Sequence, residues 1–357
     1  MSKFYLLFSF LVVHMAVFFF AFPDTAIGVD TYAYWMPLSF LLVFEWALLG
    51  IYMKGLSFFP GRNLADALNE TTGKWIASLV LLPMMIYMLS DIILMARNIA
   101  AMIIIVFLPK TPLWALLCSF IVVPVFCAAS GLHTILRSCA LFITLFLPIL
   151  LFSIFSAASN VDFYNALPIL DRQPSFLTDR NFYSSTFAIS PFLYLGMARA
   201  SQLKLFPNPR YGYLAFFGLL LLLLVSVYWP ILIFGKSSAE TFHFPFVMAL
   251  DTVNLEWFLF DRITMFFIIS VAVFSSMHSA LTLWALSKIA HSLFGKIRRE
   301  WYIVVLGFLF FAGAYSIPNY DWIEQLTVWQ IPWRMYSIVG IPLFILTVGL
   351  WRRRRSA

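Results

Sequence analysis

The sequence predicts an all-α integral membrane protein of about ten transmembrane helices, and three observations point to this fold class. Of its 357 residues, 62% are hydrophobic and only 11% are charged, whereas a soluble chain averages about 25% charged residues. Apolar stretches of about 20 residues, the length that crosses the hydrocarbon core, follow one another with short polar gaps. Basic residues alternate from one gap to the next. The chain is therefore expected to form a single transmembrane domain over residues 1–357.

The length rule places each expected span. The third and eighth are longer than about 30 residues and must tilt or protrude, while the fourth and ninth have about 17, near the minimum. The spans are expected near residues 4–22, 32–53, 75–108, 112–128, 134–157, 182–204, 211–235, 258–290, 301–317 and 331–350.

Loop charge predicts the orientation of the chain. With an even number of spans, 16 basic loop residues fall on the side of the termini and 5 on the other side. Because Lys and Arg concentrate in cytoplasmic loops, both termini are expected in the cytoplasm of a multi-pass cell membrane protein. Residues 351–357, with four arginines after Trp351, are expected to form a basic cytoplasmic tail held by anionic membrane lipid.

The two halves of the chain, residues 1–157 and 182–350, share a pattern of lengths and interruptions. The long third and short fourth spans correspond to the long eighth and short ninth. The first span ends at Phe22-Pro23, and the sixth contains Ser190-Pro191 and Gly196. Matching interruptions are typical of inverted-repeat transporters that bind their ligand near the midplane. A five-plus-five inverted-repeat, transporter-like fold is therefore predicted.

Charges inside the predicted spans are candidates for function, because unpaired polar groups are costly in lipid. Glu45 lies in span two, and Asp91 and Arg97 lie in span three. Six helical residues turn by about 600°, so Asp91 and Arg97 point about 120° apart, whereas Asn98 shares the Asp91 face. Asp91 and Asn98 are expected either to contact a ligand or ion in a central cavity or to hold helices together. Glu45 and Arg97 are expected to pair with each other.

Span six offers candidate ligand-binding residues in Ser190, Pro191, Tyr194 and Gly196. Pro191 lacks an N–H group, so carbonyls near Phe187 lose their helical partners. Such freed carbonyls and half-helix ends hold ions and carboxylates in transporters. The alternative is a plain proline kink whose carbonyls accept from serine hydroxyls. Gly196, five residues further on, favours a genuine break.

Two kinds of polar residue in apolar helices have competing interpretations. Ser275 in span eight is a candidate ligand residue, although small residues there also favour close helix packing. His14 and His278 are single imidazoles in apolar spans. A core histidine with a hydrogen-bond partner is expected for each, and a proton relay is the alternative.

Loop motifs along nearly the whole chain carry a resemblance to a known family. They are Phe59-Pro60-Gly61-Arg62-Asn63-Leu64 with Thr72-Gly73-Lys74-Trp75, Leu108-Pro109-Lys110-Thr111-Pro112-Leu113-Trp114, Gly131-Leu132 with Ile135-Leu136-Arg137, Asn165-Ala166-Leu167-Pro168-Ile169-Leu170, and Asp261-Arg262-Ile263. Together they resemble the GerAB-type spore germination proteins, the B subunits of nutrient germinant receptors. The resemblance implies an amino acid–polyamine–organocation superfamily fold. It also implies a sensor of a small nutrient, often an amino acid, in the spore's inner membrane, with A-type and C-type receptor subunits as partners.

The sequence departs from that family's pattern at two places. The family's glycine-rich break in span one corresponds here to Ala16 and Phe18, which become candidate ligand residues by position. A phenylalanine adopts positive φ only at a cost, and its ring fills space. The family often has an acidic residue after the span-six glycine, and Gly196-Met197-Ala198 has none. These departures imply a different or smaller nutrient, a weakened site, or lost ligand recognition.

Enzyme, cofactor, metal and nucleic-acid functions are not expected. The chain has no P-loop, no Gly-x-Ser-x-Gly and no His-Glu-x-x-His, and its cysteines lack zinc-ligand spacing. Its basic excess lies along one membrane face. The expected function is a germinant-receptor B subunit. One alternative is a proton- or sodium-coupled amino acid transporter, and another is a structural membrane subunit without ligand recognition.

Overall fold

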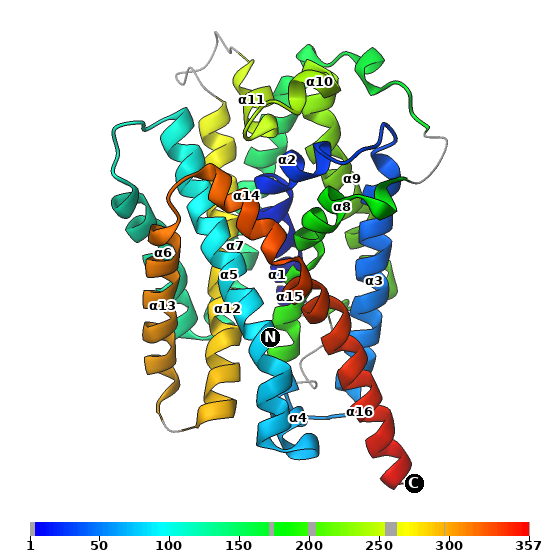
Figure 1. Ribbon diagram of the computed structural model, residues 1–357, viewed down its shortest axis with the longest axis vertical. Helices are drawn as coiled ribbons and strands as arrows, with labels where there is room; N and C mark the ends of the chain where they lie inside the picture. The colour runs from blue at the N-terminus through cyan, green and yellow to red at the C-terminus, as the bar shows by residue number, and fades with distance from the viewer. Residues whose placement is uncertain (1–3, 171–174, 199–204, 254–262, 296, 357) are drawn as a thin grey trace.

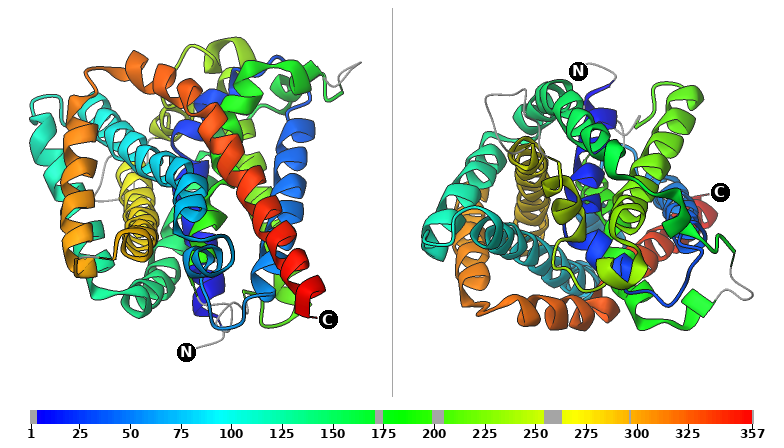
Figure 2. Two further views of the ribbon diagram at one scale, coloured as in Figure 1. Left: turned by 60° about the horizontal axis from the view of Figure 1, so that its bottom comes forward. Right: turned by 90° about the horizontal axis from the view of Figure 1, so that it is seen from above.

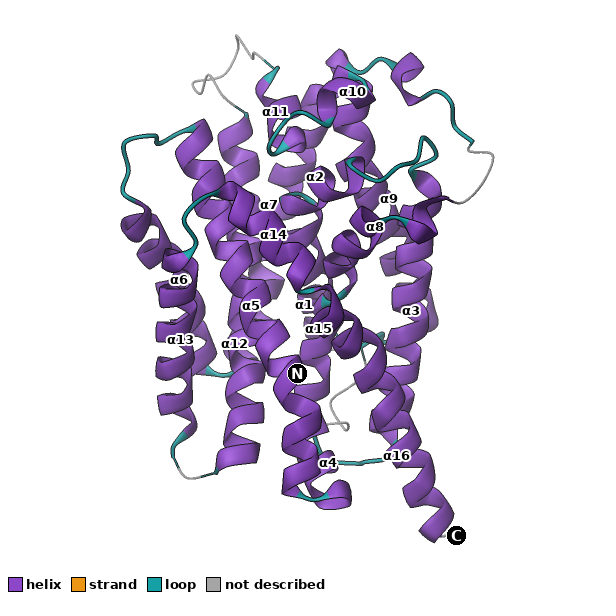
Figure 3. Cartoon of the chain, in the orientation of Figure 1, coloured by secondary structure: helices purple, strands orange, loops and turns teal. Residues whose placement is uncertain are grey.

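The computed structural model describes residues 4–170, 175–198, 205–253, 263–295 and 297–356. Every regular element within these ranges is a helix (Figure 3). The long helices stand side by side in one bundle, and short helices and loops cover one of its ends (Figure 1). The all-α architecture predicted from the sequence is confirmed.

The helices fall into long spans and shorter pieces. The long ones are α3 (Trp35–Ser57), α5 (Lys74–Val106), α6 (Leu113–Ser130), α7 (Leu132–Ser156), α9 (Pro209–Phe234), α12 (Thr264–Phe294), α13 (Arg299–Ser316) and α16 (Ile341–Ser356). The short ones are α1 (Tyr5–Phe18), α2 (Ala21–Ile27), α4 (Leu64–Thr72), α8 (Arg180–Ser185), α10 (Lys236–Ala239), α11 (Pro245–Asp251), α14 (Tyr320–Trp329) and α15 (Ile331–Met335). The 3-10 helices are η1 (Ala157–Asn160), η2 (Phe163–Ala166), η3 (Ser175–Thr178), η4 (Thr186–Ile189) and η5 (Pro191–Met197), and a π-helical turn, η7 (Tyr336–Gly340), joins α15 to α16.

Span lengths agree with the sequence. Helices α5 and α12 have 33 and 31 residues, and α6 and α13 have 18 each. Within the described residues, seven helices are long and apolar enough to cross a membrane, or eight when α1 and α2 count as one bent span. With α13 and the interrupted sixth segment added to those eight, about ten segments cross.

The first span is broken although it has no glycine at the bend. Helices α1 and α2 meet at 56°, and Phe20 between them has φ −102° and ψ −98°. Among the described non-glycine residues only Phe244 has positive φ. The bend therefore does not need the left-handed conformation that a glycine would supply. Phe18 is the last residue of α1 and is fully buried.

The sixth segment leaves the α-helix for most of its described length. It continues from α8 as η4 and η5, and the backbone becomes extended at Ala198. Pro191 starts η5, and the Ser190 hydroxyl donates to the Phe187 carbonyl at 2.9 Å. Both sequence interpretations therefore hold in part, because the helix is broken and a serine hydroxyl satisfies the freed carbonyl.

The bundle has two distinct ends. The start of α1 and the end of α16 lie at one end, here called the termini face (Figure 2, left). Helices α2, α8, α10 and α11 lie toward the opposite end, here called the vestibule face (Figure 1). Seen from above, α1 lies near the middle of the bundle, where it packs against α7, α9 and α12 (Figure 2, right). Helix α16 continues through the basic tail to Ser356.

The segment after α9 packs into the protein. Phe244 and Phe246 are fully buried, and the Phe246 ring lies 5.1 Å from that of Phe19. These aromatic side chains therefore cover the bend of the first span and do not lie on the membrane surface.

Candidate functional site

A cavity of about 50 Å³ lies beside the bend of the first span. Its walls come from α1 and α2, from one face of α5, from η4, and from the α14–α15 junction. Most of the wall is apolar, as in small-molecule sites that use a few polar groups for orientation. The lining residues are Ala16, Val17, Phe20, Ala21, Asp91, Leu94, Met95, Asn98, Phe187, Ile323, Thr327 and Gln330.

Four polar side chains line this cavity: Thr327, whose hydroxyl donates to the Ile323 carbonyl, and three others. Asp91 is 14% exposed, and its Oδ2 lies 3.2 Å from Nε2 of His278. Asn98 is 3% exposed with an unpartnered Oδ1, and Gln330 is 7% exposed with an unpartnered Nε2. A buried polar atom without a partner costs about 1–3 kcal/mol, so each requires an explanation. The residues that line the cavity thus carry two hydrogen-bond acceptors, the Asp91 carboxylate and Asn98 Oδ1, and one donor, Gln330 Nε2, for a small polar ligand.

A second cavity, of about 420 Å³, connects the site to the vestibule face. It shares Ala21, Asn98, Ile323 and Thr327 with the central cavity. Its other walls belong mainly to α2, α8 and α14. We call it the vestibule. A solute can therefore approach Asn98 from this face of the bundle.

The path toward the termini face is closed. The hydroxyl groups of Ser9 and Tyr194 lie 2.8 Å apart and join α1 to η5. Tyr52 of α3 packs against Gly196, where an added Cβ would lie 1.7 Å from the tyrosine oxygen. Within the part of the chain that the structure describes, the site is therefore open toward the vestibule face and covered by these contacts toward the termini face.

The structure brings some of the predicted ligand residues to the cavity and places others beside it. Ala16, Asp91 and Asn98 line the central cavity, whereas Phe18 packs between His14 and Phe22. A smaller space of about 10 Å³, room for about one water molecule, adjoins Asp91. Ser190, Pro191, Tyr194 and His278 contribute to its walls.

Ser275 and Gly196 act at helix contacts. The Ser275 hydroxyl of α12 donates to the Ala16 carbonyl at 3.3 Å, so it joins α12 to the last turn of α1. Gly196 allows η5 to approach Tyr52. Both residues support the broken segments without facing the central cavity.

The expected pairing of Glu45 with Arg97 is wrong. Glu45 is fully buried, and its Oε1 lies 2.6 Å from Nε2 of His14. Arg97 donates to the carbonyls of Ile317 and Pro318 at 2.9 and 3.1 Å. Helix α3, which carries Glu45, packs mainly against α9 and α16 rather than against α5, which carries Arg97. Each of the two charged side chains therefore has its partner on another segment.

The His14–Glu45 contact holds a proton. Nδ1 of His14 lies 2.6 Å from the Phe10 carbonyl, and since a carbonyl only accepts, Nδ1 carries a hydrogen. Nε2 and the Glu45 oxygen must then share another hydrogen at 2.6 Å. His14 and His278 are both core histidines with carboxylate partners.

Sequence reasoning missed Gln330 and Arg334. Arg334 is fully buried behind the cavity wall, with its guanidinium 5.7 Å from the Phe187 ring. One nitrogen donates to the carbonyls of Tyr183 and Thr327, while Nε and Nη1 are unpartnered. Arg334 lies inside the expected span 331–350, so the rule for intramembrane charges was the signal that could have found it.

The chain has a transporter-like fold, because its helices are arranged as in several solved transporters. A nucleobase-cation-symport-1 family transporter, solved in a closed conformation with bromovinylhydantoin bound, matches with a TM-score of 0.63 and 13% identity over 98% of this chain and 79% of that chain. MhsT in complex with L-phenylalanine matches with a TM-score of 0.53 and 12% identity, covering 96% and 97%. A mutant of the Eremococcus coleocola manganese transporter matches with a TM-score of 0.61 and 12% identity, covering 96% and 79%.

The sequence profile of the spore germination proteins, also called spore permeases, matches residues 1–319, and the chain belongs to this family. No curated protein sequence matches the chain. The all-α, five-plus-five transporter-like fold predicted from the sequence is confirmed, as is the resemblance to spore germination proteins. The chain is a multi-pass membrane protein of permease or receptor type.

Proposed function

We propose that the chain is the B subunit of a spore nutrient germinant receptor, which senses a small amino acid in the central cavity. One observation carries the proposal: Asn98 and Gln330, each with an unpartnered buried polar atom, line a small, mostly apolar cavity beside Asp91. Membership of the spore germination family supports the biological role.

The polar groups match the two ends of a zwitterion. Asp91 and Oδ1 of Asn98 accept hydrogen bonds and suit an ammonium group, while Nε2 of Gln330 donates and suits a carboxylate. The buried Arg334 guanidinium behind Phe187 adds positive charge on the Gln330 side. A cavity of about 50 Å³ favours a short side chain.

The orientation of the chain is proposed from the charge of its loops, and its membrane is proposed from its family. Both termini lie in the cytoplasm and the membrane is the spore's inner membrane, so the vestibule opens outward, toward arriving nutrient. Residues 1–157 and 182–350 are the two repeats, and the ligand lies between their broken spans. The bound ligand contacts α1, α2, η4 and α14 at the same time. Because it binds one arrangement of these helices more tightly than another, it increases the fraction of molecules in that arrangement. The A-type and C-type subunits recognise this arrangement.

Direct binding tests this function. The full chain in lipid nanodiscs is titrated calorimetrically with L-alanine and the other common amino acids. Asn98→Ala and Gln330→Ala each remove one charge-assisted hydrogen bond, worth about 1.5–3 kcal/mol, and should weaken binding about 10- to 100-fold. The control is Thr144→Ala, which removes a hydroxyl exposed on α7.

Spores carrying the same variants extend the test. Asn98→Ala and Gln330→Ala should raise the nutrient concentration needed for germination in parallel with the loss of affinity, and Thr144→Ala should not. Wild-type protein that binds no amino acid, or cavity variants that bind as wild type does, would contradict the assignment. If removing the chain destroys the receptor while the cavity variants germinate normally, its role is that of a structural subunit.

A proton-coupled amino acid transporter is the second candidate, favoured by the two buried histidine–carboxylate contacts, His14–Glu45 and His278–Asp91. Such pairs can pass protons. Proteoliposomes that contain only this chain are loaded with a pH gradient and given labelled L-alanine. Accumulation that a protonophore abolishes would establish transport in place of sensing alone.

A further inference from the structure

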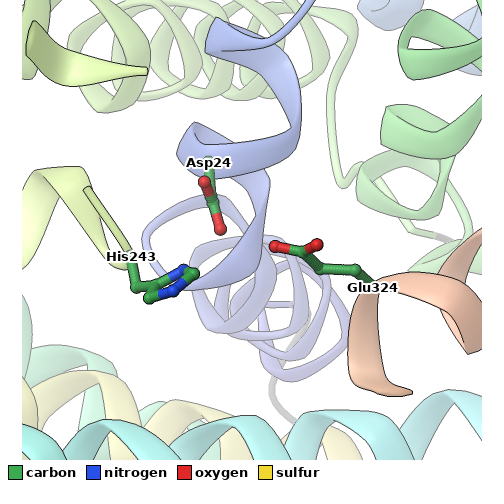
Figure 4. A group of neighbouring side chains, drawn as sticks. All are labelled: Asp24, His243 and Glu324. Atoms are coloured by element: carbon green, nitrogen blue, oxygen red, sulfur yellow. The ribbon is translucent and has the colours of Figure 1, made fainter. Parts of the chain in front are cut away.

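Three potential metal ligands meet at the mouth of the vestibule. Asp24 belongs to α2, His243 to the connection between α10 and α11, and Glu324 to α14. Their side chains point toward one another from three separate segments (Figure 4). One donor atom from each residue lies within 4.8 Å of the other two. Nothing in the sequence spacing suggests this group, because its members are far apart along the chain.

Tyr320 holds two of these ligands in place. Its hydroxyl donates to Oδ2 of Asp24 at 2.5 Å, which leaves Oδ1 for another partner. The His243 imidazole packs on the Tyr320 ring with a centroid separation of 4.4 Å. Groups that hold the ligands in this way are typical of metal sites, where they set orientation and raise affinity.

The charge balance of the group favours a cation. A carboxylate oxygen of Asp24 and one of Glu324 lie within 4.8 Å of each other. Two carboxylates this close repel each other when both are ionised. A bound divalent ion would remove that repulsion and replace lost hydration.

We propose that Asp24, His243 and Glu324 form a binding site for a divalent transition-metal ion such as Zn²⁺ or Mn²⁺. One imidazole and two carboxylates match the ligand preferences of these ions, whereas Ca²⁺ and Mg²⁺ prefer oxygen alone. Zinc bonds of about 2.0–2.2 Å place tetrahedral ligands about 3.4 Å apart. The donor atoms lie within 4.8 Å of one another, so the proposal requires the exposed side chains of His243 and Glu324 to move closer together.

The proposed ion would connect elements that border the route to the central cavity. Helix α2 is the outer half of the bent first span, and α14 links α13 to the last span. Asp24 and Glu324 also line the vestibule. Metal occupancy would therefore set how far α2 and α14 separate at the mouth. Metal binding at this site does not depend on the proposed sensing function, and its test measures neither amino acid binding nor germination.

The test is a metal titration of the full chain in lipid nanodiscs after removal of metal by a chelator. Wild type should bind one Zn²⁺ per chain and unfold at a higher temperature when Zn²⁺ is present. His243→Ala and Glu324→Gln should each weaken Zn²⁺ binding about 10-fold or more. His133→Ala, which removes another exposed imidazole on α7, should bind Zn²⁺ as wild type does.

Tyr320→Phe separates a metal site from a purely structural contact. It keeps the ring beneath His243 and removes only the hydroxyl bonded to Asp24. Metal-free Tyr320→Phe should unfold near the wild-type temperature, yet bind Zn²⁺ about 10-fold more weakly. The proposal is overturned if wild type binds neither Zn²⁺ nor Mn²⁺, or if His243→Ala and Glu324→Gln bind as tightly as His133→Ala.

Discussion

Buried polar side chains organise the interior of this protein. Asp91 contacts His278, Glu45 contacts His14, and Arg334 donates to backbone carbonyls behind the cavity. Because lipid offers no hydrogen bonds, each polar group inside the bundle requires a partner from the protein or a ligand. Most have one, and among the residues with an unpartnered polar atom, Asn98 and Gln330 line the central cavity. The presence or absence of a hydrogen-bond partner thus distinguishes structural polar side chains from those that are available to a ligand.

The His14–Glu45 contact is expected to stabilise the bundle. His14→Ala leaves the fully buried Glu45 carboxyl without its partner, and breaking a buried pair costs about 3–5 kcal/mol. The free energy of unfolding, measured in mixed detergent micelles, should fall by that amount. The double variant His14→Leu with Glu45→Leu removes both polar groups and should recover most of the loss. Equal losses in the single and double variants would contradict a pairing role.

At the scale of the elements, the two broken segments create the site. The bend between α1 and α2 lets Ala16, Val17, Phe20 and Ala21 form one wall. The 3-10 turns of η4 place Phe187 opposite. The interruption of the sixth segment was predictable, because Pro191 marks it in the sequence. The first span was expected to end at Phe22-Pro23, but it bends earlier, at Phe19–Phe20, and Pro23 lies inside α2. That phenylalanines could form the first bend without a glycine was not predictable, since the backbone of Phe20 stays at negative φ.

Gly196 tests the contact that closes the termini face. An added Cβ at this position would lie 1.7 Å from the Tyr52 oxygen, so Gly196→Ala forces the buried Tyr52 side chain to move. The free energy of unfolding should fall by about 1–3 kcal/mol. The access of solutes to the cavity from the termini face should also change. Gly218→Ala on α9 is the matched control, because nothing lies within 4 Å of its added Cβ. Equal effects of the two substitutions would show that this close approach is unimportant.

At the scale of the whole molecule, the central cavity is accessible from the vestibule face and covered toward the termini face. The vestibule opens on the face opposite the chain termini, and the Ser9–Tyr194 and Tyr52–Gly196 contacts seal the other face. A sensor of external nutrient requires the open face outside. The orientation proposed from 16 basic loop residues against 5 meets that requirement.

Cysteine labelling checks this orientation. With Cys118, Cys127 and Cys139 replaced by alanine, single cysteines are introduced by Ser57→Cys, at the end of α3, and Ser238→Cys, in α10; both positions are exposed. A membrane-impermeant maleimide applied to intact cells should label only the Ser238→Cys protein, and both after the membrane is opened. Labelling of the Ser57→Cys protein alone in intact cells would reverse the assigned orientation.

The sequence by itself determined the membrane class, the lengths of the spans, the interruption at Pro191 and the shared face of Asp91 and Asn98. These features depend on hydropathy and helical period, which are local properties of the chain. Only the tertiary structure decided which helices are neighbours. It separated Glu45 from Arg97, brought Gln330 to the cavity, and joined Asp24, His243 and Glu324. Such contacts depend on packing between distant segments, which no local pattern records.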